Sequence, residues 1–85
     1  MRVTNIIHLK LDNMKKFVLA TTNTETLEID MWGFETHEEA YSEMEEQYKE
    51  VVSGLEGFVT DNDIYEDSAY ISSVDYDYVW NIKEL

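Results

Sequence analysis

The sequence contains no cysteine and no proline, and only three of its 85 residues are glycine. Without cysteine, disulfides and thiolate metal sites are excluded, so the fold must be stabilised by packing. The chain has no apolar run of roughly 18 residues, the length of a membrane span, and no basic stretch followed by an apolar one opens it. We therefore expect neither secretion nor membrane insertion, and we expect a cytoplasmic protein.

Basic residues are also scarce. The chain has 6 Lys and Arg residues against 19 Asp and Glu residues, which gives a net charge of −13. Between residues 17 and 82 the single basic residue is Lys49. A charge magnitude of about 2–8 suffices for the solubility of a small domain. The surplus repels nucleic acid and anionic lipid, so the expected partner is a positively charged protein surface.

Apolar residues, in contrast, are abundant. The chain is 44% hydrophobic and 13% aromatic. Acidic disordered segments have few aromatic residues and cannot bury enough apolar surface to fold. Residues 1–85 are therefore expected to form a single acidic domain with one modest core.

Alternation of apolar and polar residues predicts the strands. Residues 3–11 show it most clearly, with Ile7, Leu9 and Leu11 on one side and His8 and Lys10 on the other. Short turns separate this segment from the next two, which predicts an antiparallel meander. The acidic segment 58–67 is expected to be a connector. The five predicted strands are 3–11, 17–21, 27–32, 68–72 and 78–85.

A helix is predicted over residues 37–53. Thr36 and Glu39 have the spacing of a capping box, and Gly54 and Gly57 supply the stop. An apolar stripe then follows helical spacing and is expected to dock on the sheet: Ala40, Tyr41, Met44, Tyr48, Val51, Val52 and Leu55. The predicted fold class is α+β, a single domain with an antiparallel sheet of about five strands. The predicted element order is β-β-β-α-β-β, with one amphipathic helix packed on the sheet.

The outer side of this helix carries the clearest candidate site. Glu39, Glu43, Glu46 and Glu50 recur every three or four residues and should form a ridge of carboxylates roughly 16 Å long. Lys and Arg side chains that bind phosphates would also bind such a ridge, which favours a nucleic-acid-binding protein as the partner. The alternative is a solvated helix face with no partner. The oligomeric state is open between a monomer and a dimer.

A second acidic group follows the helix and would extend this surface. It consists of Asp61, Asp63, Glu66 and Asp67. A calcium loop of the EF-hand type would need glycine where Glu66 stands and a bidentate glutamate where Ser72 stands, so no metal or cofactor is expected. Trp32 and Tyr65 are the candidate aromatic contacts, because guanidinium groups stack on aromatic rings and also pair with carboxylates.

No catalytic pattern is present, and we expect a protein that is not an enzyme. His8 and His37 do not have a zinc or catalytic spacing. The sequence contains no HExxH motif, no nucleophile elbow and no glycine-rich phosphate loop. A domain of this size rarely encloses the pocket that catalysis requires.

Three segments carry a resemblance to known proteins. They are ETHEEAY at 35–41, DSAY at 67–70 and YDYVWNI at 76–82. On these residues the chain resembles small uncharacterised proteins of phages and mobile elements in Gram-positive gut bacteria. In size and charge it is similar to the anti-CRISPR and anti-restriction class. That resemblance implies an inhibitor that occupies the nucleic-acid-binding groove of a host defence protein. The alternative is a non-catalytic accessory domain whose acidity serves solubility or self-association.

Overall fold

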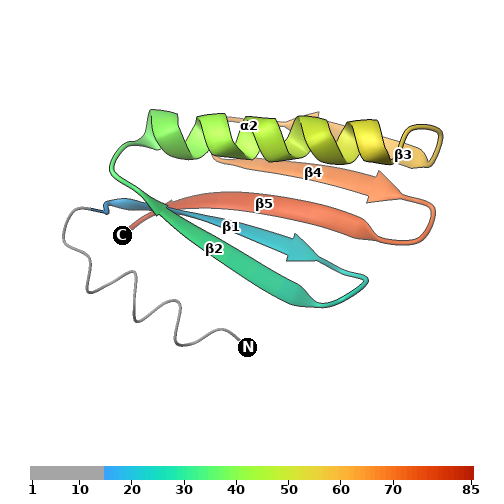
Figure 1. Ribbon diagram of the computed structural model, residues 1–85, viewed down its shortest axis with the longest axis horizontal. Helices are drawn as coiled ribbons and strands as arrows, with labels where there is room; N and C mark the ends of the chain where they lie inside the picture. The colour runs from blue at the N-terminus through green and yellow to red at the C-terminus, as the bar shows by residue number, and fades with distance from the viewer. Residues whose placement is uncertain (1–14) are drawn as a thin grey trace.

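The computed structural model describes residues 15–85, which form a five-stranded sheet with one helix packed on one face (Figure 1). The strands lie in the spatial order β2-β1-β5-β4-β3, and every neighbouring pair is antiparallel. The α+β class, with about five antiparallel strands and one amphipathic helix, is confirmed. In chain order the elements are β1 (Phe17–Asn23), β2 (Glu28–Phe34), α2 (His37–Gly54), β3 (Val59–Ile64), β4 (Ser68–Ser73) and β5 (Asp77–Glu84).

One strand lies where a connector was expected. The segment 58–67 contains β3, which pairs with β4. Asp and Asn are depleted in strands, so this segment has little strand propensity of its own, and pairing with β4 overrides that tendency. The expected strand at 3–11 lies outside the described residues. Among the described residues, β1 pairs with β2 along one edge and with β5 along the other.

The helix begins as the sequence predicts. The Thr36 hydroxyl accepts a hydrogen bond from the Glu39 amide, and the Glu39 carboxylate accepts one from the Thr36 amide, both at 3.2 Å. This capping box satisfies two backbone donors that the first helical turn leaves without a partner. The helix ends at Gly54, and Gly57, with φ of 90°, turns the chain toward β3.

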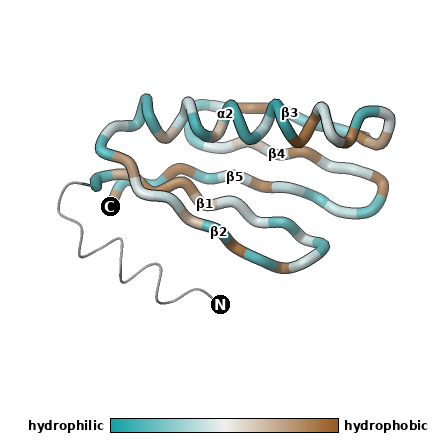
Figure 2. Tube along the Cα trace, in the orientation of Figure 1, coloured by the Kyte–Doolittle hydropathy of each residue, from teal (hydrophilic) through white to brown (hydrophobic). Residues whose placement is uncertain are grey.

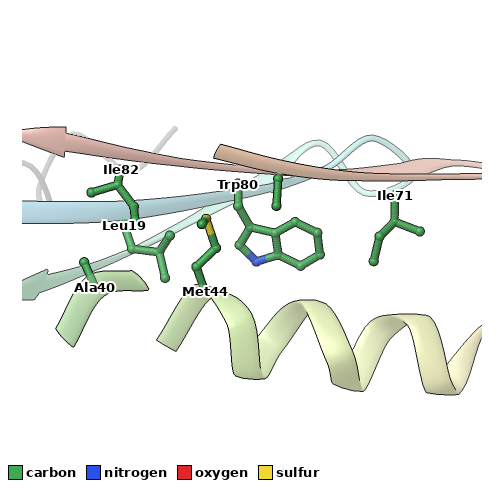
Figure 3. Close-up of a cluster of buried hydrophobic side chains, with 7 residues drawn as sticks. Leu19, Ala40, Met44, Ile71, Trp80 and Ile82 are labelled. Carbon is green, nitrogen blue, oxygen red and sulfur yellow. The ribbon is translucent and has the colours of Figure 1, made fainter. Parts of the chain in front are cut away.

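The apolar stripe of α2 packs on the sheet. Figure 2 shows hydrophilic residues along most of the helix and hydrophobic ones toward its C-terminal end. Ala40 and Met44 are fully buried, and Tyr48, Val51 and Leu55 are partly buried against the same cluster. Figure 3 shows the helix and sheet side chains that meet between the two layers. The buried cluster consists of Leu19, Ala40, Met44, Ala69, Ile71, Trp80 and Ile82.

Strand register determines which residues share the helix side of the sheet. Leu19 lies opposite Ile82 on β5 and opposite Trp32 on β2. Because directly opposed residues in an antiparallel pair lie on the same face, Trp32 belongs to the helix side. Ile29 and Met31, the alternate residues of β2, therefore lie on the other face.

Candidate protein-binding surface

The predicted ridge of carboxylates lies on the outward side of α2. Glu39, Glu46 and Glu50 are exposed, and Glu43 is half-buried. Lys49 does not interrupt the row, because its amino group lies toward the other flank, 3.9 Å from a Glu45 carboxylate oxygen. The four ridge carboxylates thus lie on one side of the helix, and Glu46 and Glu50 are exposed there.

Gln47 connects this ridge to the core. Its amide nitrogen donates to Glu43 at 2.8 Å, and its amide oxygen accepts from the Trp80 indole at 3.0 Å and from the Thr21 hydroxyl at 3.1 Å. These bonds hold Glu43 in one position above β1 and β5. The sequence pattern did not single out Gln47, since a glutamine between glutamates looks like an ordinary surface residue.

The ridge lies toward the β2 side of the sheet. On the opposite flank of the helix, the Tyr48 hydroxyl donates to Asn62 of β3, whereas Gln47 reaches Thr21 of β1. The strand order β2-β1-β5-β4-β3 therefore places the Gln47 flank, and Glu43 next to it, nearer to β2.

Strand β2 adds two carboxylates and an aromatic ring to this region. Asp30 lies opposite Thr21, and Glu28 lies opposite Asn23, so both belong to the helix side with Trp32. The Trp32 side chain is 37% exposed. We call the combined surface the acidic face. It is made of Glu39, Glu43, Glu46 and Glu50 of α2 with Glu28, Asp30 and Trp32 of β2.

Asp61 and Asp63 do not join the acidic face. Asn62 between them points toward the helix, where it accepts from Tyr48. Since side chains alternate along a strand, Asp61 and Asp63 lie on the opposite face of the sheet. There the Tyr70 hydroxyl donates to Asp61 at 2.9 Å, and this bond is the main reason why the pKa of Tyr70 is raised to about 12.

The turn between β3 and β4 holds the remaining predicted acids. Glu66 is exposed, and Asp67 lies 2.7 Å from the imidazole of His37 at the start of α2. The His37 ring packs edge-on against Phe17, with 5.9 Å between ring centroids. Asp67 thus contacts the N-terminus of α2. Tyr65, at the end of β3, is 53% exposed, and the nearby Asp63 carboxylate raises its pKa.

The predicted contact residues are therefore divided between different parts of the molecule. Trp32 lies on the same side of the sheet as the helical ridge, whereas Asp61 and Asp63 lie on the other side. Glu28 and Asp30 were not predicted. Their alternation with Trp32 in the sequence was the available signal, but only the pairing with β1 reveals which side they occupy.

The described residues were also considered for a metal site and for a membrane-spanning helix, and the chain was compared with known proteins. Within 15–85, no group of three or more His, Asp or Glu side chains is arranged to hold a metal ion. The one helix in this part of the chain lacks the length and apolar character needed to cross a membrane. No family model matches the chain, and searches of curated proteins and of solved structures found no match either.

Proposed function

We propose that this protein is a non-catalytic inhibitor that binds a basic surface of another protein and excludes nucleic acid from it. The single observation that carries the proposal is the acidic face. Six carboxylates from α2 and β2 share one side of the molecule with an exposed tryptophan. The proposed setting is the cytoplasm, and the proposed class of partner is a host defence protein of the type that anti-CRISPR and anti-restriction proteins block.

The spacing of the ridge supports this proposal. Successive ridge carboxylates are three or four residues apart, so they follow one another at roughly 5 to 6 Å along the helix axis. A surface that binds phosphates with Lys and Arg recognises the charge and position of the phosphate groups more than the identity of the bases. A row of carboxylates with this spacing would therefore pair with many of the same Lys and Arg side chains.

Trp32 would supply an aromatic contact in addition to the charge interactions of the acidic face. Charge complementarity chiefly accelerates association, whereas buried aromatic residues prolong the life of a complex. Trp32 lies beside Asp30 and is partly exposed, so one arginine could stack on the indole and pair with the carboxylate.

A second candidate function is an accessory binding domain whose acidity serves solubility or self-association. Two observations favour it. Glu39 belongs to the helix cap, and Glu43 is bonded to Gln47, so half of the ridge also serves the fold. In that case no partner would depend on Glu46 and Glu50, the other two members of the ridge.

Capture from a lysate at low and high salt tests the choice between these functions. Glu46→Gln with Glu50→Gln removes two charges from the acidic face without touching the cap or the Gln47 network. Glu56→Gln with Asp75→Asn removes two charges from other exposed positions. The proposal predicts that only the first pair weakens capture of a basic nucleic-acid-binding protein. Equal capture by both variants would favour the accessory function.

A further inference from the structure

The two edges of the sheet differ in their free hydrogen-bonding groups. On β3, the register with β4 turns the amides of Asn62 and Ile64 outward. Each donates to the preceding aspartate side chain, Asn62 to Asp61 at 2.9 Å and Ile64 to Asp63 at 2.8 Å. These bonds occupy two of the donors that a neighbouring strand would need, so the β3 edge is less suited to further pairing.

The β2 edge has no such closure among residues 15–85. Lys16 donates to the Phe34 carbonyl, so the backbone groups of Phe34, and of every second residue before it, point toward β1. The alternate residues, Ile29, Met31 and Gly33, therefore direct their N–H and C=O groups away from the sheet. No hydrogen bond between described residues uses these groups.

The side chains along this edge define the chemistry of an added strand. On the helix side, Glu28 and Asp30 present carboxylates, and on the other side Ile29 and Met31 present apolar surface. A strand added beside β2 would place its own side chains alternately next to these two groups. Basic residues would suit the first side and apolar residues the second.

We propose that the β2 edge binds an extended segment of the partner in which Lys or Arg alternates with apolar residues. The inference rests on the proposed function, because it specifies how the basic partner is held. Backbone hydrogen bonds from the β2 edge would provide affinity, and the alternating side chains would provide specificity.

A second copy of the chain suits this edge less well. Pairing two β2 edges would bring Glu28 and Asp30 of one copy close to the same residues of the other. It would also join two chains that each carry a net charge of −13. Like charges on adjacent strands are destabilising. The acids of β2 therefore oppose self-association and favour a basic strand.

Amide hydrogen exchange in the full-length protein tests the proposal directly. The probe is a short synthetic peptide of alternating lysine and valine, and a glutamate–valine peptide is the charge control. In the free protein, the amides of Ile29, Met31 and Gly33 should exchange rapidly, and the lysine peptide alone should protect them. The amides of Asn62 and Ile64 should be unaffected. Protection of the β2 edge already in the free, dilute protein would overturn the proposal, because the chain itself or a second copy would then occupy it.

Two modified reagents separate backbone pairing from simple charge attraction. Met31→Pro removes one outward N–H, which an edge strand tolerates, and Met31→Ala changes only the side chain. The proline variant should bind the peptide about tenfold more weakly than the alanine variant. A lysine–valine peptide whose alternate backbone amides are methylated should bind the unmodified protein as weakly as the unmethylated peptide binds the proline variant. This second comparison keeps the test valid if the proline variant does not fold. Equal binding of methylated and unmethylated peptides would contradict strand addition.

Failure of this inference can be told apart from failure of the proposed function. If no β2 amide is protected while the protein still displaces nucleic acid from a basic partner, strand addition is wrong and the inhibitor function stands. If the amides are protected but no nucleic-acid-binding protein is captured, the edge binds basic strands and the inhibitor function is wrong.

Discussion

The indole nitrogen of Trp80 donates a hydrogen bond to the side-chain oxygen of Gln47, at 3.0 Å. Gln47 belongs to α2, the helix whose outer side is acidic. Trp80 is fully buried, and its N–H has no other hydrogen-bond partner among the described residues. The same amide of Gln47 also positions Glu43. One polar side chain therefore joins the core of the sheet to the surface proposed to bind the partner.

Replacing Gln47 should destabilise the protein. Gln47→Ala leaves the buried indole N–H without an acceptor, and the cost of an unsatisfied buried donor is about 1–3 kcal/mol. Urea unfolding gives the change in free energy, and Ser42→Ala, at an exposed position of the same helix, is the control. Equal stability of the two variants would mean that the network contributes little.

Met44 should be the most costly single truncation on α2. Its side chain is fully buried between the helix and Leu19, Trp80 and their neighbours (Figure 3). Met44→Ala should lower the free energy of unfolding by about 2–5 kcal/mol, because it opens a cavity in a small core. Met44→Leu nearly conserves volume and should cost less than about 1.5 kcal/mol. A small effect of the alanine variant would show that the helix packs differently.

Added salt should raise the melting temperature near neutral pH. The net charge of −13 makes the folded state repel itself, and mobile ions screen exposed charges. Calorimetry over a series of sodium chloride concentrations measures the effect. If the melting temperature does not depend on salt, the carboxylates are already compensated and the surplus charge carries no energetic cost.

The hydrogen bond from Tyr70 to Asp61 should make stability fall at high pH. The pKa of Tyr70 is raised from 10.0 to about 12 in the folded protein, first by this bond and further by desolvation and the surrounding charges of Asp61, Tyr65 and Asp63. Because the pKa is higher in the folded protein, the hydrogen bond contributes fully to the free energy of unfolding below pH 10. That contribution is lost as pH rises toward about 12. Tyrosinate absorbance should show a phenol that titrates near pH 12, disappears in Tyr70→Phe and shifts downward in Asp61→Asn.

Local signals in the sequence were sufficient for the helix and for much of the sheet. The capping box of Thr36 and Glu39 and the glycine stop at Gly54 are encoded within a few residues, so the helix bounds could be predicted. The strand predicted over 78–85 likewise corresponds to β5, in which Trp80 and Ile82 are buried. Strand β3 could not be found in this way, because its Asp and Asn residues favour turns and only pairing with β4 makes it a strand.

The candidate surface was predictable only within single elements. The spacing of Glu46 and Glu50 with their helical neighbours gives the ridge directly from helix geometry. Whether Asp30 or Asp61 shares a face with that ridge depends on strand order and register, which connect residues far apart in the chain. This is why Asp30 was missed and why Asp61 was placed with the ridge although it lies on the other side.

The most direct measurement is a competition between this protein and nucleic acid for the captured basic partner. The partner is first saturated with its labelled nucleic acid, and the acidic protein is then titrated in. We predict that the label is released as the protein binds, and that the Glu46→Gln, Glu50→Gln variant requires a higher concentration to release it. A stable complex that contains the partner, its nucleic acid and this protein together at saturating concentrations would contradict the account.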